Sequence, residues 1–372
     1  MSRFRFELAT PADDADLRQV MAATPMPGRI ALRFRREPSF FDAADVDGRW
    51  RQIIVARDCQ QDRVIGLGSR SVRDMYVNGA VCSVGYLSNL RLLPEYRGSS
   101  VMARGYRFLR KIHTDGRASF YLTTIADDNH AVKALLTSGR AHLPEYHDVG
   151  AYFTLALPLN SRDTRANGES ADLQLRPATA SDLPEVIRFY ESTGPRRQFF
   201  PRYTLDDLAG SAPTFRGLEP VNLMLALRKD QLVGTLGVWD QRAFRQTEIE
   251  SYRLGLRWTR PVLNYLACLR GLPSLPPTGA PLRYGVAALP MVRDDDPDVL
   301  SALLKAQQRA ATAGPYDFLL FGIHERDPLL NAVRRESFAE YITRVYVVCF
   351  DDGASIQQLL DDRCPYLELG CL

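Results

Sequence analysis

Apolar and polar positions along the chain follow one another in a way that predicts short strands and amphipathic helices. In the segment "VARDCQQDRVIGLGSRSV", which begins at Val55, two apolar runs flank a charged turn, and this pattern is typical of a β-hairpin. Farther on, the apolar stretch "LRLL" runs through Pro94 into the small and polar residues 97–100. Apolar residues then recur at helical spacing: Val101, Phe108, Leu109 and Ile112. We therefore expect a helix with one buried face after this turn.

The same order of elements occurs twice, which indicates an internal repeat. "ELATPADDADLRQVM" begins at residue 7 and the similar "RPATASDLPEVIRFY" at residue 176, an offset of 169. The hairpin glycine Gly66 matches Gly234 at an offset of 168. At the turn, Pro94 aligns with Pro290 at an offset of 196. The change of offset predicts an insertion of about 28 residues in the second half, which we place at residues 253–281.

Each half shows a strand, one or two helices, a hairpin, a strand that ends at a proline, a helix, a strand, a helix and a final strand. This mixed α/β (α+β) order contains a crossover helix between the fourth and fifth strands, so we expect those two strands to be parallel neighbours. A chain of 372 residues is long enough for two such domains. The predicted division is a first domain at residues 1–159, a polar, turn-rich linker at 160–171, a second domain at 172–350 and a tail at 351–372. The tail combines a short helical pattern, "ASIQQLLDDR", with an apolar end.

The composition is that of a globular protein and excludes several functional classes. Hydrophobic residues make up 45% and charged residues 24%, with no low-complexity tract, so both halves are expected to fold. The 47 basic and 44 acidic residues give a net charge of +3, which is too balanced for a nucleic-acid partner. No window reaches the roughly 18 uncharged apolar residues of a membrane span, and the N-terminus lacks the apolar region of a signal peptide. We therefore expect a cytoplasmic protein.

Cysteine and histidine spacing gives no sign of a metal centre. The six cysteines are scattered without a CxxC pair, and the five histidines show no HExxH or other ligand spacing. We therefore expect neither a metal site nor a disulfide framework.

The turn at residues 97–100 has the features of an anion site. The first N–H groups of a helix lack helical acceptors, and the helix dipole favours negative charge there. Gly98, Ser99 and Ser100 are small enough to let a ligand approach. The following helix is basic: it carries Arg104, Arg107, Arg110 and Lys111. A phosphate-bearing ligand fits this pattern better than a metal ion or a nucleic-acid groove.

This arrangement resembles the GCN5-related N-acetyltransferase family, in two tandem copies. The fourth strand of that family ends in an L-x-V-x-P-x-x-R-G pattern, which is seen here as Leu90, Leu92, Pro94, Arg97 and Gly98. The resemblance implies that each copy is a mixed, mostly antiparallel sheet flanked by helices, with a splayed pair of parallel strands. It also implies acetyl-CoA, or another acyl-CoA, as cosubstrate and an amine as acceptor.

The resemblance further implies where the coenzyme binds. Main-chain groups of Leu90, Arg91 and Leu92 would pair with the pantetheine arm. The pyrophosphate would meet Arg97 and the loop that follows it: Gly98, Ser99, Ser100, Val101, Met102 and Ala103. Asn129 stands where the family often has an asparagine after its fifth strand.

Several positions depart from the family pattern. Ser100 and Met102 replace two loop glycines, and Leu136 replaces the tyrosine that protonates the leaving thiolate in many members. A different acid, a water molecule or a loss of catalysis would each account for Leu136. In the second copy Arg293 matches the turn arginine and is followed by Asp294–Asp296, whose charges would repel a pyrophosphate. We therefore expect the coenzyme in the first copy and a degenerate second copy.

Transfer to an amine needs a group that accepts a proton, because an alkyl amine with a pKa of about 10.4 is protonated at neutral pH. Candidates near the splayed strands of the first copy are Tyr86, His142, Glu145 and His147. A further option is the apolar end at Leu369–Leu372, since some tandem members of this superfamily use the terminal carboxylate as base. A packed or frayed tail is the simpler interpretation.

The insertion contributes an aromatic and basic group of residues: Tyr252, Arg257, Trp258 and Arg260. These residues either wall the acceptor site or belong to a helix that packs on the sheet and holds its arginines in solvent. We prefer the second interpretation.

Three functions are compatible with these features. The first is an acyl-CoA-dependent N-acyltransferase, with acetyl-CoA as the expected donor, in which the first copy alone is active and the amine attacks the thioester directly. The second is a non-catalytic module that binds acyl-CoA or another ligand, which Leu136 and the missing glycines favour. The third is a structural or interaction protein in which both copies have lost the coenzyme. The ordered repeat and the turn at Arg97 and Gly98 favour the first.

Overall fold

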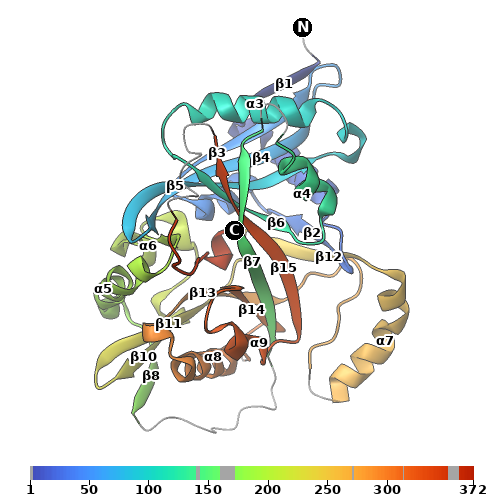
Figure 1. Cartoon of the computed structure of the whole chain (residues 1–372). Helices are drawn as coiled ribbons and strands as arrows, with labels where there is room; N and C mark the ends of the chain where they lie inside the picture. Colours follow the sequence, from blue (N-terminus) through green and yellow to red (C-terminus); the bar gives the residue numbers. More distant parts are fainter. Residues whose placement is uncertain (1–2, 140–142, 160–171, 270–271, 313, 351–359) are drawn as a thin grey trace.

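The computed structural model of the chain contains one long twisted sheet with helices on its faces, a mixed α/β fold (Figure 1). It describes residues 3–139, 143–159, 172–269, 272–312, 314–350 and 360–372. Within these ranges, thirteen strands share the large sheet and two further strands form a separate ribbon. The predicted linker and most of the helical pattern predicted in the tail lie outside the described residues. No helix in the described ranges is long and apolar enough to cross a membrane.

The elements of the two halves follow the predicted order, except that the first half has an additional strand, β2, and the second half has two, β9 and β12. The first half comprises β1 (Phe4–Leu8), α1 (Asp14–Ala23), β2 (Ile30–Arg35), α2 (Phe40–Ala44), β3 (Trp50–Asp58), β4 (Arg63–Val77), β5 (Ala80–Leu92), α3 (Val101–His113), β6 (Tyr121–Ala126), α4 (His130–Leu136) and β7 (Glu145–Pro158). The second half comprises β8 (Leu173–Pro177), α5 (Leu183–Thr193), β9 (Phe200–Pro201), α6 (Leu205–Leu208), β10 (Leu223–Arg228), β11 (Gln231–Trp239), β12 (Gln246–Tyr252), α7 (Leu254–Leu269), β13 (Tyr284–Val292), α8 (Pro297–Thr312), β14 (Phe318–His324), α9 (Leu330–Arg334) and β15 (Ala339–Cys349).

The hydrogen-bond register of the two hairpins confirms their equivalence. In β3–β4, Gly66 lies opposite Ala56, and the register shifts after this pair. In β10–β11, Gly234 lies opposite Ala226, and the register shifts at the same place. The repeat that the sequence predicts is therefore present in the backbone.

The predicted alignment of the turn in the second half is wrong by four residues. Leu92 pairs with Gly66 and Val292 pairs with Gly234, so Leu92 and Val292 are equivalent, at an offset of 200 rather than 196. The matches of residue 94 with 290 and of residue 97 with 293 rested on residue identity alone. On the corrected alignment α8 begins at Pro297, the equivalent of residue 97. The second half therefore lacks the small, polar turn that precedes α3.

The fourth and fifth strands of each half are parallel neighbours, as predicted. β5 pairs with β6 at Gly85 and Tyr121, and β13 pairs with β14 at Gly285 and Leu319. α3 and α8 make the two crossover connections. α3 packs on the sheet through Tyr106 and Leu109.

The last strands of the two halves are exchanged. The order across the sheet is β1-β3-β4-β5-β6-β15-β7-β14-β13-β11-β10-β8. β15, from the second half, pairs with β6 of the first, whereas β7, from the first half, pairs with β14 of the second. The two exchanged strands also pair with each other, and they cross at the centre of the molecule (Figure 1). Each half therefore completes its sheet with a strand from the other.

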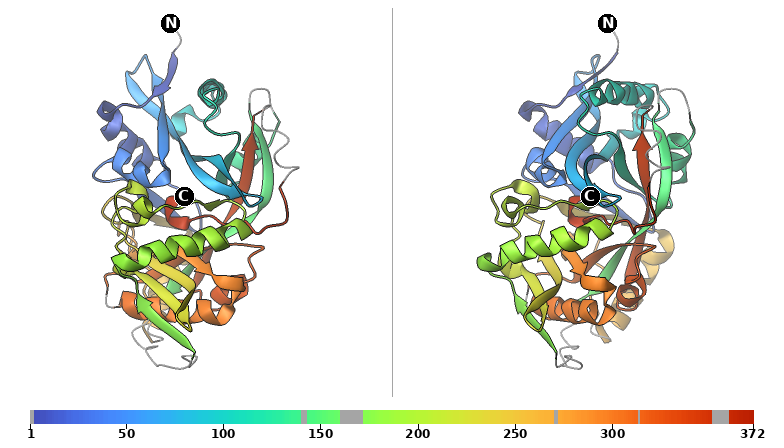
Figure 2. Two further views of the ribbon diagram at one scale, coloured as in Figure 1. Left: turned by 90° about the vertical axis from the view of Figure 1, so that its left-hand side faces the viewer. Right: turned by 60° about the vertical axis from the view of Figure 1, so that its left-hand side comes forward.

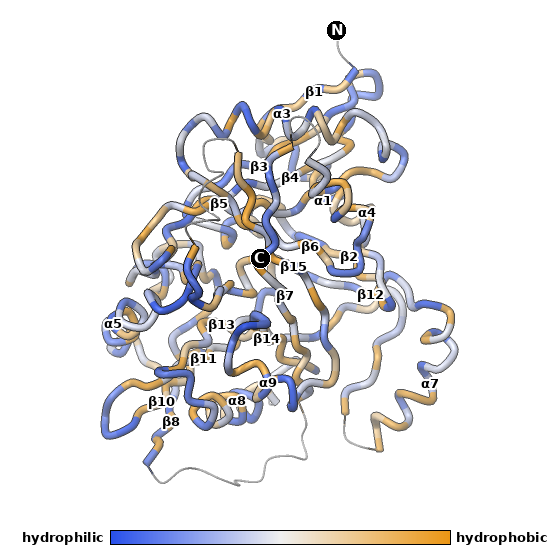
Figure 3. The backbone as a smooth tube through the Cα atoms, viewed as in Figure 1, coloured by the Kyte–Doolittle hydropathy of each residue, from blue (hydrophilic) through white to orange (hydrophobic). Residues whose placement is uncertain are grey.

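α7 forms most of the predicted insertion and lies at the periphery, with hydrophobic residues along its length (Figure 3). Seven of its large apolar side chains are exposed: Leu254, Trp258, Val262, Leu263, Tyr265, Leu266 and Leu269. Trp258 is 78% exposed, and the guanidinium of Arg260 lies over the ring of Tyr252 at 5.8 Å. The preferred interpretation of a helix packed on the sheet is therefore wrong.

Candidate functional site

β5 and β6 separate soon after they meet. Among the described residues their parallel pairing ends at Tyr86 and Leu122. Beyond this pair β5 continues along β4 and β6 continues along β15, so the facing edges diverge. The Thr123 hydroxyl donates to the carbonyl of Leu87 at 2.8 Å where the divergence begins. The first half thus has the predicted splayed pair, with Leu90–Leu92 on its β5 edge.

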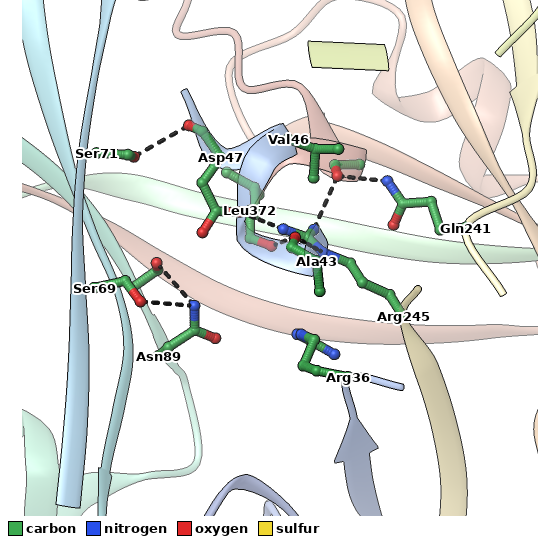
Figure 4. A network of polar contacts seen from close by, with 12 residues as sticks. Arg36, Ala43, Val46, Asp47, Ser69, Ser71, Asn89, Gln241, Arg245 and Leu372 are labelled. Carbon is green, nitrogen blue, oxygen red and sulfur yellow. Dashed lines mark hydrogen bonds and ion pairs between the residues drawn. The ribbon is translucent and has the colours of Figure 1, made fainter. Parts of the chain in front are cut away.

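A β-bulge interrupts β5 inside the splay. The register with β4 shifts between Leu67 and Ser69, opposite Asn89, whose φ is 54°. The Asn89 amide donates to the hydroxyls of Ser69 and Ser88, both at 3.2 Å, and the bond to Ser69 is drawn in Figure 4. Bulges re-aim the main chain and are frequent beside active sites.

The turn between β5 and α3 is exposed and small. Gly98 has a φ of 77°, in the left-handed region that favours glycine, and a Cβ there would meet no atom within 4 Å. The Ser99 hydroxyl donates to the carbonyl of Tyr96 at 2.6 Å, which holds the turn together. Arg97 and Ser100 are exposed like the residues between them. The first N–H groups of α3 therefore lie beside an open surface of small residues.

Two departures from the family pattern are accounted for by packing. Met102 is half-buried against the hydrophobic cluster that contains Tyr106, so its side chain leaves the turn free. Leu136 is buried in the same cluster. The side-chain oxygen of Asn129 accepts the N–H of Val132 at 3.3 Å and caps α4. A contact of Asn129 with a coenzyme stays a prediction.

The basic residues of α3 divide between structure and solvent. The Arg104 guanidinium donates to the carbonyl of Phe4 at 2.7 Å, and that of Arg110 lies over the ring of Phe350 at 5.4 Å. Arg107 and Lys111 are exposed. Half of the basic set is therefore available to an anion near the helix.

A small, partly open cavity lies at the apex of the splay, because the last parallel pair, Tyr86 and Leu122, lines it. The remaining walls come from distant parts of the chain: Asp47, Arg73, Met75, Phe199, Pro201, Tyr366, Leu367, Glu368, Cys371 and Leu372. A molecule that runs along the β5 edge from the turn would thus end at a pocket with carboxylate, guanidinium and phenol groups.

A network of polar groups fixes one wall of this cavity (Figure 4). Arg245 forms a buried ion pair with Asp47. Its guanidinium also donates to the carbonyls of Ala43, Gly370 and Leu372 at 3.2, 3.0 and 3.2 Å. Burial raises the pKa of Asp47, and the neighbouring arginines oppose this change. The apolar end of the tail is therefore inserted into the interior and lines the cavity. A role of the terminal carboxylate as base stays a prediction.

Solved structures share this architecture over the whole chain. The N-myristoyltransferase of Saccharomyces cerevisiae with bound myristoyl-CoA aligns over 94% of this chain and 83% of its own, with a TM-score of 0.59 and 12% identity. A GCN5-related N-acetyltransferase from Sphaerobacter thermophilus aligns over 100% and 99%, with a TM-score of 0.58 and 11% identity. This chain has the fold of the GCN5-related N-acetyltransferases. No protein-family model and no curated protein matches its sequence.

A third similar structure lies within a larger protein. It is a GCN5-related glucosamine N-acetyltransferase region of a fungal multi-domain GH3 β-N-acetylglucosaminidase. The alignment covers 93% of this chain and 38% of that chain, with a TM-score of 0.59 and 14% identity. The matching region is therefore part of a longer chain in that protein.

Among the predicted proton-transfer residues, Tyr86 lies at the cavity of this GCN5-related fold. It is buried, and its hydroxyl is 3.0 Å from the hydroxyl of Thr124. Burial raises the pKa of Tyr86, so the phenol keeps its proton at neutral pH. A proton-transfer role for Tyr86 stays a prediction.

Glu145 and His147 lie farther along the sheet. They are neighbours on β7, with Oε2 and Nε2 3.3 Å apart. His147 shares a row with Tyr86, but β6 and β15 lie between the two, so about 14 Å separates their positions. Neither residue lines the cavity, and His142 lies outside the described residues. A catalytic role for Glu145 or His147 stays a prediction.

Sequence patterns did not single out the charged groups of the cavity. Asp47 belongs to "DAADVDGRW", which is typical of an exposed turn, yet it is buried. Arg73 lies within β4 and Glu368 within the tail, and both are buried. The available signal was the apolar end of the chain, which pointed to an inserted tail but not to the carboxylate within it.

Proposed function

We propose that this chain is an acyl-CoA-dependent N-acyltransferase whose first half binds the acyl-CoA. One observation carries the proposal: the splay between β5 and β6 leads from the exposed turn before α3 to the cavity at Tyr86 and Leu122. The fold neighbours support it, since two are N-acyl- or N-acetyltransferases by name and one holds myristoyl-CoA.

The parts of the donor have separate places in this proposal. The pyrophosphate binds at the turn from Arg97 to Ala103, where helix N–H groups and small side chains meet solvent. The pantetheine arm follows the β5 edge at Leu90–Leu92. The thioester then reaches the apex beside Tyr86, and the amine occupies the cavity.

The reaction is a direct transfer. The amine nitrogen attacks the carbonyl carbon of the thioester, a C–N bond forms, and the C–S bond breaks with its electron pair on sulfur. The nitrogen loses a proton, and the sulfur gains one, so the products are an amide and the free thiol of coenzyme A.

We infer that the second half binds no acyl-CoA. α8 begins at Pro297, and the carboxylate of Asp296 accepts the N–H groups of Asp298 and Val299 at 3.0 and 3.3 Å. Asp296 also pairs with Arg228 at 3.2 Å. In the second half, the carboxylate of Asp296 thus occupies the position that corresponds to the open turn of the first half.

Calorimetric titration with acetyl-CoA tests the donor site. We expect one molecule bound per chain, and a loss of at least tenfold in affinity when Ser99→Asp and Ser100→Asp are combined, because two carboxylates then face the pyrophosphate. Thr259→Asp on the exposed helix α7 is the matched control and should leave binding unchanged. Absence of binding at millimolar acetyl-CoA, by heat and by thermal stabilisation, would contradict the proposal.

Release of free thiol distinguishes an enzyme from a non-catalytic binder. The non-catalytic binder is the second candidate function, and it is favoured by Leu136, which is buried and stands in place of the family's tyrosine. The acceptors tested are a diaminoalkane, glucosamine, an aminoglycoside and a peptide with a free N-terminus. Amine-dependent thiol release is expected with at least one of them, whereas a binder would show affinity for acetyl-CoA and no release.

A further inference from the structure

The C-terminal tail fills the cleft of the second half. β13 and β14 pair in parallel as far as Val286 and Leu320 and then diverge, as β5 and β6 do in the first half. The cavity beyond this point is lined by Pro290–Val292 of β13, by Phe321–His324 of β14 and by Pro365–Leu367 of the tail. The tail therefore lies where the first half has its splay, and both views in Figure 2 place the C-terminus between the halves.

Main-chain hydrogen bonds fix the tail in this place. The N–H of Gln198 donates to the carbonyl of Cys364 at 3.0 Å, and the N–H of Tyr366 donates back to the carbonyl of Gln198 at 2.8 Å. The hydroxyl of Tyr152, on the exchanged strand β7, donates to the carbonyl of Leu367 at 2.8 Å. The residue that follows, Glu368, is therefore held in one position.

The bulge of the second half binds the Glu368 side chain. Leu289 is equivalent to Asn89 at the offset of 200: each has a φ of 54° and each lies at a register shift. The N–H of Leu289 donates to Oε2 of Glu368 at 3.0 Å. A main-chain donor inside the second cleft is thus used to hold a carboxylate.

The two oxygens of Glu368 differ in their contacts. Oε2 also accepts the hydroxyls of Tyr366 at 2.7 Å and Tyr203 at 3.4 Å. Oε1 is buried and has no hydrogen-bond partner in the part of the chain that the structure describes. Glu368 is 3% exposed and lines the apex cavity of the first half. A buried carboxylate oxygen without a partner is costly unless a ligand binds it.

Glu368 differs from the other carboxylate side chain at this cavity. Asp47 forms a buried ion pair and a hydrogen bond with the guanidinium of Arg245. Glu368 forms no ion pair with a described lysine or arginine. Of these two side chains, Glu368 is the one free to exchange a proton with a ligand.

We propose that Glu368 is the proton acceptor for the amine in the apex cavity and that the cleft of the second half holds Glu368 in position for this role. The proposal rests on the proposed function. As the amine nitrogen bonds to the thioester carbon and the sulfur leaves with its electron pair, the proton on nitrogen passes to Oε1. The carboxyl group then returns that proton to the thiolate, which leaves as coenzyme A, and Glu368 is ionised again.

The electrostatics of the site suit this role. Burial raises the pKa of Glu368 to about 7, and the bonds from Tyr366 and Leu289 limit the rise. A base with a pKa near the working pH transfers protons most effectively. The titratable and charged groups that face Glu368 are Arg73, Tyr152, Tyr190, Tyr203, Tyr366 and Cys371.

The test compares Glu368→Gln with the unchanged protein in the thiol-release assay. We expect kcat to fall at least a hundredfold while KM for acetyl-CoA stays within about twofold, because the change removes proton transfer and leaves the donor site intact. The rise of kcat/KM near pH 7 should disappear. Glu336→Gln, at an exposed position, is the matched control and should keep both the rate and the pH profile.

Two further variants keep the test decisive if the glutamine variant folds poorly. Glu368→Asp should retain the rise near pH 7 at a reduced rate. Tyr366→Phe removes a bond that lowers the pKa of Glu368, so the rise should move to higher pH. Activity within threefold of the unchanged protein in Glu368→Gln, with the same pH profile, would overturn the proposal.

Slow hydrolysis of acetyl-CoA gives a readout that needs no known amine, because water then takes the place of the acceptor. Glu368→Gln should lower this rate as well. If the unchanged protein releases thiol neither with amines nor with water, it has no reaction for a proton acceptor to serve, and the proposal is overturned. Failure of the proposed function is recognised separately, since the unchanged protein would then either bind no acetyl-CoA or bind it without any release of thiol. Glu368→Gln itself should bind acetyl-CoA normally.

Discussion

Replacing Glu368 with glutamine is expected to change how the stability of the protein depends on pH. The carboxyl is fully enclosed, and its pKa in the folded protein is about 7 against an ordinary value of 4.5. Between these two values the folded protein holds a proton at Glu368 that the unfolded chain has released. The free energy of unfolding therefore falls as the pH rises through this window and reaches its lower level above pH 7.

The size of the effect follows from the difference between the folded and unfolded pKa of Glu368. A tenfold change in an acid dissociation constant corresponds to about 1.4 kcal/mol, so the ionised carboxylate costs about 3 kcal/mol in the folded state above pH 7. Glutamine carries no charge at any of these pH values. Glu368→Gln should therefore gain about 2–3 kcal/mol in free energy of unfolding, relative to the unchanged protein, between pH 5 and pH 8.

Urea unfolding of both proteins at a series of pH values measures this difference. Other groups cancel in the comparison, among them His324, whose pKa is lowered to about 4 by burial in both proteins. The exposed change Glu336→Gln is the control and should give a difference that is independent of pH. A difference between Glu368→Gln and the unchanged protein that stays constant within about 1 kcal/mol from pH 5 to 8 would refute the reasoning.

Three further substitutions test the framework around the site. Gly85→Ala should lower the free energy of unfolding by about 1–3 kcal/mol, as followed by urea, because the new Cβ would lie 2.1 Å from the ring of Tyr121 at the apex of the splay; an unchanged midpoint would count against this close contact. Asp115→Asn should cost about 3 kcal/mol, because it removes the negative charge and one of the two oxygens that pair with the fully buried guanidinium of Arg70, and a loss below about 1 kcal/mol would be inconsistent with that pair. Trp258→Gln should change thermal stability by less than about 0.5 kcal/mol, because the side chain is 78% exposed, and a large loss would show that α7 is packed.

Local sequence patterns predicted most of the fold. A glycine after a charged turn identified both hairpins, and Gly66 and Gly234 occupy equivalent places in the hydrogen-bond register. The crossover helix predicted the parallel pair at Tyr86 and Leu122, because a strand can pair in parallel only after such a connection. These features depend on residues close together in sequence, so a single sequence is sufficient to predict them.

The turn of the second half shows where residue identity fails. Pro94 and Pro290 are the same residue, yet the pairing of Leu92 and Val292 places them four residues out of step. A loop can lose residues without loss of the strands that flank it, so identity across a loop is a weaker guide than strand register. The corrected alignment is what makes Leu289 the equivalent of Asn89.

The buried charged residues of the site could not be predicted from local sequence patterns. Asp47 and Glu368 lie in segments whose polar composition is typical of exposed turns and tails, and they are held inside by bonds to residues 198 and 79 positions away. The exchange of β7 and β15 has the same cause, because the apolar pattern of a strand does not identify its partner. Contacts between residues far apart in sequence therefore determine these parts of the site, which the sequence alone did not predict.

The exchange of β7 and β15 has a consequence for synthesis. β6 borders the proposed acyl-CoA splay, and its second partner, β15, begins at Ala339, more than 200 residues later in the chain. During translation the first half therefore presents an unpaired strand edge until almost the whole protein has emerged, and such edges promote misassembly. Neither half can therefore complete its own sheet when it is separated from the other.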